Sequence, residues 1–180
     1  MKLTTEWLTE QQACQDGMAW FTAQTETDSI KVVRKLHLNA RNDWANWLIV
    51  RLMNRTQRLK YVINAAELAL PIGEKQYPED KRARLAIEAA RAVLANDTEE
   101  TRKLALKAYY AAAATTYAYT YAYTYTYSAA AATYAYTYFA GAATYAYTYY
   151  AADAAGIGWN ELLEYGIGLL ESEEKNERNI

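Results

Sequence analysis

The sequence contains one cysteine and one histidine, Cys14 and His37. A single cysteine excludes an internal disulfide framework, which fits a reducing compartment. Because Cys14 lies in a stretch that reads as helix, we predict a small core residue there rather than a nucleophile. A single histidine leaves too few ligands for a histidine-based metal site and too few parts for a catalytic triad. We therefore expect no metal, no cofactor and no enzymatic activity, and we expect His37 at a helix end.

Long apolar runs are absent as well. The first twelve residues, MKLTTEWLTEQQ, lack the apolar core of a signal peptide. No stretch approaches about twenty strongly apolar residues, the length that a membrane-spanning helix needs. The chain has 180 residues, which suits one domain with a sizeable core. We expect a soluble, cytoplasmic protein that makes no membrane contact.

Charge is scarce in the second half of the chain. Residues 1–107 hold 17 Lys and Arg against 14 Asp and Glu, whereas residues 108–180 hold 2 against 7. Between Lys107 and Glu161 the one charged side chain is Asp153. A nucleic-acid groove needs cations that follow the phosphates, so this Tyr-rich segment does not predict a nucleic-acid partner.

The first 107 residues read as consecutive helices with short polar joints. Thr9 and Gln12 form a capping-box pattern, which predicts a helix that runs to about Gln24. Three further helices are predicted from a candidate N-cap followed by apolar residues at helical spacing. Their caps and inward faces are Asp28 with Ile30, Val33, Leu36 and Leu38; Asn42 or Asp43 with Trp44, Trp47, Leu48 and Leu52; and Asn54 or Thr56 with Leu59, Tyr61, Val62, Ala65, Ala66 and Leu68.

Pro71 and Gly73 should end or kink the last of these helices, and YPED at 77–80 predicts a turn. Thr98 is the candidate N-cap of a later helix that has two glutamates in its first turn, where the helix dipole favours them. Two more helices are expected, with a charged tail that frays after the second. The first of the two is 80–96, which Asn96 closes and whose inward residues are Leu85, Ile87, Ala89, Ala90 and Leu94. The second is 159–172, whose inward residues are Trp159, Leu162, Leu163, Leu169 and Leu170.

Residues 111–155 contain an eleven-residue repeat. TYAYTYFAGAA (133–143) and TYAYTYYAADA (144–154) are in register, and residues 122–132 form a degenerate third copy. Eleven residues make three helical turns with about 20° of drift. On a helix, Tyr125, Tyr136 and Tyr147 would share one stripe, opposite a longer stripe of six tyrosines. We therefore predict helices here, with breaks near Ser128 or Gly141.

A strand interpretation of the repeat stays open. Tyrosine alternates strictly from Tyr117 to Tyr127, and Thr and Tyr are good strand formers. Four consecutive alanines are more typical of a helix than of a hairpin loop, however. The predicted fold is thus all-α: an antiparallel multi-helix array, or solenoid-like bundle, in one domain. Its parts are mixed-charge helices at 1–107, repeat helices at 108–155, a closing helix at 156–172 and a charged tail at 173–180.

Three parts of the sequence carry a family resemblance: DWANWLIVRLM (43–53), YPEDKRARLAIEAARAVLAN (77–96) and the Ala/Tyr-rich run after TEETRKLA. They resemble an all-helical family that is found in bacteriophage genomes and labelled "putative immunity protein". The resemblance covers roughly residues 10–155, and the string at 80–90 is its most specific part. The members of this family resemble the helical immunity proteins of bacterial toxin systems. The resemblance implies a binding role related to toxins or defence, in a bacterial host cell.

Two groups of residues in the first half are candidate binding residues. Lys81, Arg82, Arg84 and Arg91 place cations in and after the first turn of a helix, where they oppose its dipole. They either pair with Asp43, Glu67 or Glu88 on neighbouring helices or form an anion-binding patch. The second group, Trp44 and Trp47, belongs to the core or anchors an interface.

The stripe of Tyr125, Tyr136 and Tyr147 is a third candidate surface. Tyrosine and alanine without charge suit either a core or the centre of an interface. The repeat contains more tyrosines than one small core can bury, since a buried hydroxyl needs a partner. Some of these rings are therefore expected to face another chain, a ligand or water.

Two functions of different classes follow. The first is an immunity or counter-defence protein that binds a protein or a small anionic partner stoichiometrically; its partner would be a toxin or a defence effector. The alternative is a structural phage protein that uses the Tyr/Ala repeat to form homo-oligomers.

Overall fold

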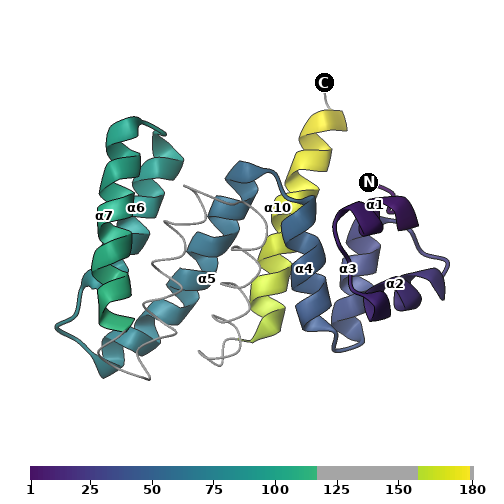
Figure 1. The fold of residues 1–180 in the computed structure, drawn as a ribbon, viewed down its shortest axis with the longest axis horizontal. Coiled ribbons are helices and arrows are strands. Elements are labelled where there is room, and N and C mark those ends of the chain that lie inside the picture. Colours follow the sequence, from purple (N-terminus) through teal and green to yellow (C-terminus); the bar gives the residue numbers. More distant parts are fainter. Residues whose placement is uncertain (117–157, 179–180) are drawn as a thin grey trace.

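The computed structural model describes residues 1–116 and 158–178, and the regular structure in these ranges is helical apart from a single bridge between Lys2 and Asp28 (Figure 1). The predicted all-α class is confirmed. The helices of these ranges are α1 (Thr5–Glu10), α2 (Gln15–Thr22), α3 (Ser29–Leu38), α4 (Asn42–Leu52), α5 (Arg55–Gln76), α6 (Arg82–Ala95), α7 (Glu99–Thr116) and α10 (Trp159–Arg178). Within these ranges, no helix combines the length and the hydrophobicity that a bilayer crossing requires.

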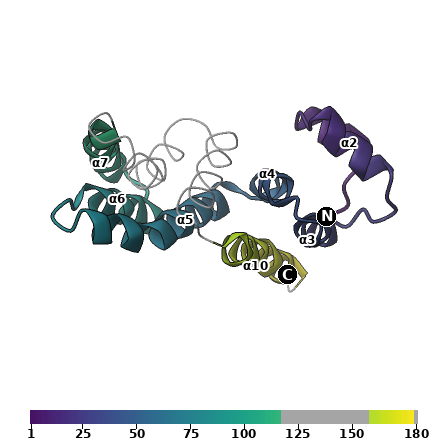
Figure 2. The ribbon, with the colours of Figure 1, turned by 90° about the horizontal axis from the view of Figure 1, so that it is seen from below.

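Helices α3, α4, α5 and α6 form a row, and the last helix of the chain packs across its middle. Helix α10 contacts α3, α4 and α5, while α6 contacts both α5 and α7. Figure 2 shows α10 on one face of the row and α2 and α7 on the other. The C-terminal helix therefore joins the N-terminal helices to the α5–α7 region.

The apolar core consists of two clusters, and α5 contributes to both. The larger cluster lies between α1–α4, α5 and α10, and the smaller one lies between α5, α6 and α7. Alanines make up much of the smaller cluster, so its helices approach closely with little side-chain volume between them. Its buried members are Leu59, Val62, Ile63, Ala66, Ala86, Ile87, Ala90 and Ala112.

Gly166 of α10 allows the closest approach at the centre of the molecule. A Cβ atom at this position would lie 2.8 Å from Cε2 of Tyr61 and 3.0 Å from Cγ2 of Ile49. Tyr61 is completely buried, and its hydroxyl donates to Oδ1 of buried Asn46 at 3.0 Å. Burial also raises the pKa of this hydroxyl. Helices α4, α5 and α10 thus meet around one ring and one buried hydrogen bond.

Most of the predicted caps are present. The Asp28 carboxylate accepts from the Lys31 amide at 3.1 Å, and Thr98 Oγ1 accepts from the Thr101 amide at 3.2 Å. Asn54 and Gln57 form a reciprocal capping box at the start of α5. Asn96 caps the end of α6, as predicted. Helix α4 begins at Asn42, with Arg41 rather than Asn42 or Asp43 at its N-cap position.

The predicted helix from Thr9 to Gln24 is wrong. Thr4 caps α1, and α1 ends in a Schellman motif with Gln12 at φ 61°. The amide of Gln12 donates to the Thr9 carbonyl and that of Ala13 to the Leu8 carbonyl, both at 2.9 Å. A new helix, α2, then begins after Cys14. The same motif ends α3, with Ala40 at φ 57° in the left-handed position.

Three other predictions about the helices need correction, and one about a turn is confirmed. Of the two outcomes predicted for Pro71 and Gly73, an end or a kink of the helix, the end is wrong, because α5 continues to Gln76. The YPED turn is present, since the Asp80 amide donates to the Tyr77 carbonyl at 3.1 Å. Two leucines predicted to face inward, Leu38 and Leu85, are 85% and 54% exposed. Helix α10 continues to Arg178, beyond the predicted end at 172.

The eleven-residue repeat is not tested. Residues 111–116 belong to α7, and the remainder of 111–155 lies outside the described residues. The stripe of Tyr125, Tyr136 and Tyr147 also lies outside them, so its role stays a prediction.

Candidate functional site

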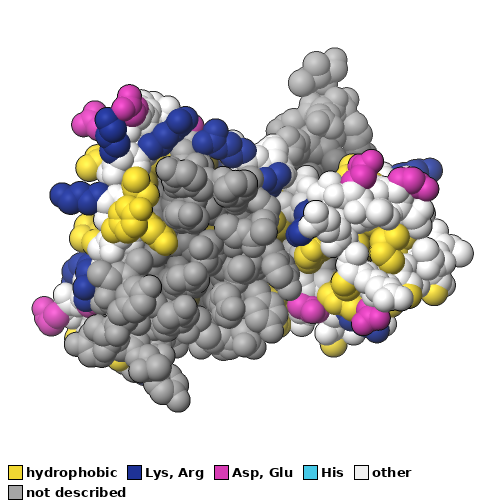
Figure 3. Space-filling view, viewed as in Figure 1, with side chains coloured by type: hydrophobic (Ala, Val, Ile, Leu, Met, Phe, Trp, Pro, Cys, Tyr) yellow, Lys and Arg dark blue, Asp and Glu magenta, His cyan; other side chains and the backbone are white. Residues whose placement is uncertain are grey.

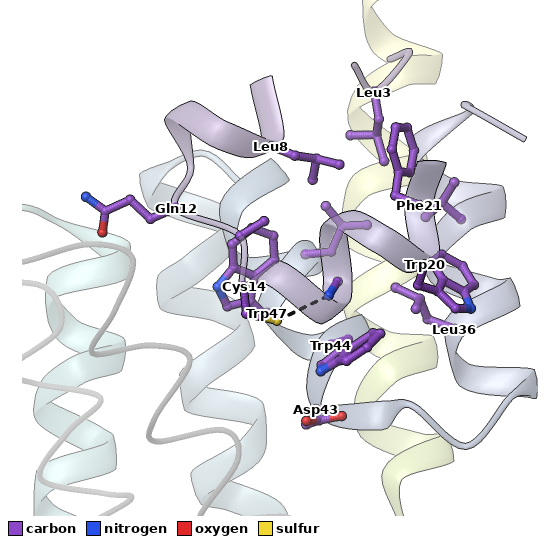
Figure 4. Close-up of a pocket in the computed structure, with 14 residues that line it drawn as sticks. Leu3, Leu8, Gln12, Cys14, Trp20, Phe21, Leu36, Asp43, Trp44 and Trp47 are labelled. Carbon is purple, nitrogen blue, oxygen red and sulfur yellow. Dashed lines mark hydrogen bonds between the residues drawn. The ribbon is translucent and has the colours of Figure 1, made fainter. Parts of the chain in front are cut away.

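A surface pocket of about 210 Å³ lies between the α1–α2 pair and the α3–α4 pair (Figure 4). Its walls are mostly large apolar side chains that also pack on the larger core cluster. Gln12 and Asp43 are the polar side chains of the lining, apart from the thiol of Cys14. The lining residues are Leu3, Leu8, Gln12, Ala13, Cys14, Gly17, Trp20, Phe21, Val32, Leu36, Asp43, Trp44, Trp47 and Leu48.

Backbone contacts hold the α1–α2 pair over α3 and α4. The Leu3 amide donates to the Thr27 carbonyl at 2.7 Å, and the Ser29 amide donates to the Met1 carbonyl at 2.9 Å. At the other end of the pair, Nε of Arg51 donates to the Gln11 carbonyl at 3.2 Å. The turn at Gln12 separates α1 from α2, so that Leu8 of α1 and Gly17, Trp20 and Phe21 of α2 all line the pocket.

Three tryptophans line the pocket, and each carries a cation over its ring. The Arg41 guanidinium lies 4.3 Å from the ring centroid of Trp44, and the Arg51 guanidinium lies 3.9 Å from that of Trp47. In addition, Nζ of Lys35 lies 5.8 Å from the Trp20 ring. These cation–π contacts hold the indoles in place and put positive charge beside an apolar pocket.

For Trp44 and Trp47 the structure supports the core alternative, and their role as an interface anchor stays a prediction. Both are half-buried and pack against the core, yet both also line a pocket that opens at the surface. Trp20 and the pocket itself were missed, because the α1–α2 pair meets α4 only through tertiary packing.

Cys14 is exposed, so its predicted place in the core is wrong. Its Sγ atom accepts a hydrogen bond from the Gly17 amide at 3.4 Å and acts as the N-cap of α2. Asp43 lies across the pocket in the first turn of α4. Its carboxylate makes no ion pair with any residue that the structure describes.

The predicted cationic cluster lies away from this pocket, along α6 and its neighbours. Arg82 pairs with Asp80 at 2.7 Å, Arg84 with Glu74 at 2.6 Å, and Nε of Arg91 donates to Glu67 at 2.6 Å. Lys81 donates to the Pro78 carbonyl at 2.6 Å. These contacts favour the ion-pair alternative, with Glu67 as a predicted partner. A binding role for the cluster stays a prediction.

The pairs Glu67–Arg91 and Glu74–Arg84 form a seam between α5 and α6. On each helix the two paired residues are seven positions apart, about 10.5 Å along the axis. The arginines are therefore spread along the seam rather than gathered around one point. The hydrogen bond from Arg84 lowers the pKa of the Glu74 carboxyl, and the one from Arg82 lowers that of Asp80.

His37 lies in the last turn of α3, at the predicted helix end. Its Nδ1 lies 2.7 Å from Oδ1 of Asn42, and its Nε2 lies 3.2 Å from Oδ1 of Asn160. The imidazole links α3, α4 and α10, which is a structural role. Among the residues that the structure describes, no group of His, Cys, Asp and Glu could hold a metal ion.

The comparisons with known proteins give one match. No curated protein and no solved structure matches the chain significantly. Residues 49–168 match the family described as "Imm-5 like putative immunity protein", and this segment covers the end of α4, all of α5–α7 and the first half of α10. Because the matched segment is more than half of the 180 residues, the chain belongs to the Imm-5-like family of putative immunity proteins.

Proposed function

We propose that this protein is an immunity or counter-defence protein that acts by stoichiometric binding of a protein partner, a toxin or a defence effector, in the cytoplasm of a bacterial cell. The observation that carries the proposal is the family match over residues 49–168. Inhibition by occlusion requires a stable surface and no turnover, and the all-helical scaffold supports such a surface.

The chemistry of the described surface favours binding over catalysis. The arginines of α6 pair with carboxylates of the same scaffold, and His37 contacts two asparagine side chains. These groups stabilise the packing of helices. The pocket between α2 and α4, by contrast, offers rigid aromatic walls, and aromatic anchor points dominate the energetics of protein interfaces.

The test is a titration of protection in cells. The protein is expressed from an adjustable promoter against a fixed level of a candidate toxin or defence effector, and the survival of the cells is measured together with both protein amounts. We expect protection to rise with the amount of the protein and to saturate near equal amounts. Full protection by trace amounts, far below the toxin, would indicate catalysis and contradict the proposal.

Self-association through the Tyr/Ala repeat remains the alternative function. Size-exclusion chromatography with light scattering separates the two. A discrete monomer or dimer that forms a complex of fixed composition with the toxin supports the immunity function. Open-ended assembly without a toxin complex would instead support the structural role.

A further inference from the structure

The pocket belongs to a part of the chain that the family match does not include. All of its lining residues lie between Leu3 and Leu48, whereas the match begins at residue 49. Binding specificity is a difference of affinities between partners. A surface outside the segment shared with the family is a place where this chain can recognise its own partner.

We propose that this pocket binds one uncharged apolar side chain, aromatic or branched aliphatic, that projects from an acidic surface of the protein partner. This inference rests on the proposed function and names the chemistry of the partner at one site.

The size of the pocket sets the size of the anchor. Its volume is about 210 Å³. An apolar cavity of about 150 Å³ binds benzene, whereas drug-sized ligands occupy roughly 300 Å³ or more. The pocket therefore accommodates a single ring or a branched aliphatic side chain. A nucleotide or another large cofactor would not fit.

The lining excludes a charged anchor. A charged group that entered the pocket would lose its hydration and meet mainly indole, leucine and valine side chains. Asp43 could pair with a cation, but a cationic anchor would also meet the positive charges of Arg41 and Arg51, which lie over the rings of Trp44 and Trp47. An anion would have no hydrogen-bond donor other than the Gln12 amide, the Cys14 thiol and the indole N–H groups. An uncharged apolar group is the anchor that the walls favour.

The charges around the pocket select an acidic surface. Lys35, Arg41 and Arg51 lie over the rings of the three lining tryptophans. Lys35 and Arg41 make no ion pair within the described part of the chain, so their charge is available to a partner. Neither these cations nor the carboxylates of α1 and α2 line the pocket, and Asp43 is its one charged lining residue. The three cations beside the walls therefore outnumber the one carboxylate among them. In the space-filling view, hydrophobic side chains reach the surface of this region between charged ones (Figure 3). Carboxylates on the partner would complement this rim.

The test uses the five tryptophans of the protein as reporters. The full chain is labelled with 5-fluorotryptophan, and each fluorine signal is assigned with one Trp→Phe variant. Three tripeptides, each with an acetylated N-terminus and an amidated C-terminus, are then titrated in: Glu-Phe-Glu, Glu-Ala-Glu and Lys-Phe-Lys. We expect Glu-Phe-Glu to shift the signals of Trp20, Trp44 and Trp47. Trp7 and Trp159, which pack on the core outside the pocket, are internal controls.

The other peptides separate the two parts of the proposal. Glu-Ala-Glu should bind at least about tenfold more weakly because it lacks the anchor, and Lys-Phe-Lys should do so because the rim repels it. Equal binding of Glu-Phe-Glu and Glu-Ala-Glu would overturn the role of the pocket, and tighter binding of Lys-Phe-Lys would overturn the acidic surface. Equally tight binding of free N-acetyl-phenylalanine amide would indicate a small-molecule site and overturn the protein anchor.

A filled pocket provides the matched control. Ala13→Leu adds an isobutyl group to the lining and should weaken Glu-Phe-Glu binding at least about tenfold. Alkylation of the exposed Cys14 with N-ethylmaleimide should do the same by a different route. Leu85→Ala, at an exposed position on α6, should leave binding unchanged. Unchanged binding in both blocked forms would contradict the proposal. Loss of protection in cells with intact peptide binding would overturn the proposed function and leave the pocket assignment standing.

Discussion

The N-terminal region (residues 1–53) and the α5–α7 region (residues 55–116) solve the packing of helices differently. In the N-terminal region, tryptophans and leucines surround a pocket that remains open. In the α5–α7 region, alanines fill the narrow space between the helices, and arginine–carboxylate pairs close its edges. In the α5–α7 region, Arg84 and Arg91 pair with carboxylates of the scaffold. Beside the pocket, Lys35 and Arg41 make no ion pair within the described residues, and this difference is the reason that we propose the pocket as the partner site.

Helix α10 contacts helices of both regions and so connects them. Arg34 of α3 pairs with both Glu164 and Glu171 of α10, at 2.9 and 3.0 Å. The Gln57 side chain of α5 donates to the Leu169 carbonyl at 2.8 Å. Substitutions at the joint, where α10 contacts α3, α4 and α5, should therefore disturb the packing of both regions. Substitutions within one region should leave the packing of the other unchanged.

The largest loss of stability is expected from Gly166→Ala, at this joint. The new methyl group would lie 2.8 Å from the Tyr61 ring, which is completely buried and has no room to move. Overpacking of this kind costs about 1–3 kcal/mol of the free energy of unfolding. Urea denaturation measures it. Gly168→Ala is the matched control: no atom lies within 4 Å of its Cβ position, so it should stabilise α10 by up to about 1 kcal/mol. Equal effects at the two glycines would contradict the close approach.

A loss of about the same size is expected from Tyr61→Phe, which removes the hydrogen bond to Asn46 that links α5 to α4. A buried acceptor that loses its donor costs about 1–3 kcal/mol. Thermal and urea melts provide the measurement. Tyr110→Phe serves as control, since Tyr110 is 62% exposed on α7 and should change little. A Tyr61→Phe protein as stable as the parent would mean that the hydroxyl contributes nothing to the joint.

Ala40→Gly should stabilise the N-terminal region by about 1 kcal/mol. Ala40 has φ 57° in the Schellman motif that ends α3, and glycine adopts this conformation without the steric cost of a Cβ atom. Ala92→Gly, at an exposed position inside α6, should have the opposite sign and a similar size. Urea denaturation of both variants decides the matter. A destabilised Ala40→Gly protein would show that the chain does not hold the left-handed conformation there.

The smallest effect is expected from the ion pairs of the α5–α7 region. Arg84 lowers the pKa of Glu74, and Arg82 lowers that of Asp80. Because these pKa values are lowered on folding, the pairs stabilise the protein fully above the ordinary carboxyl range, near pH 4, and lose that effect as the pH falls through the lowered values. Melting temperatures between pH 7 and pH 3 should fall less steeply in Glu74→Gln than in the parent. Glu79→Gln, an exposed residue in the turn before α6, should melt with the parent's pH dependence.

Local signals account for what the sequence predicted well. The caps at Asp28, Asn54 and Thr98 depend on side chains within three residues of the atoms that they bind, so a short window of sequence contains all the information. The same holds for the YPED turn. The break between α1 and α2 was missed because glutamine, not glycine, occupies the left-handed position at residue 12.

Tertiary contacts explain the features that the sequence did not predict. Leu38 and Leu85 fit an apolar stripe at helical spacing, but both side chains stay exposed because none of the described helices covers them. The seam of Glu67–Arg91 and Glu74–Arg84 could have been found, because both pairs share the same sum of residue numbers, as antiparallel helices require. The pocket could not have been found from the sequence, since its walls come from four helices whose mutual positions are set by packing.

A comparison of Ala13→Leu with the double variant Arg82→Ala, Arg84→Ala in the protection assay tests the central claim most directly. If the N-terminal region recognises the partner and the α5–α7 region is scaffold, Ala13→Leu should keep its melting temperature and lose protection. The double variant should melt at a lower temperature and still protect cells grown below that temperature. A folded double variant that fails to protect, beside an Ala13→Leu protein that protects fully, would contradict the account and place the binding surface on α6.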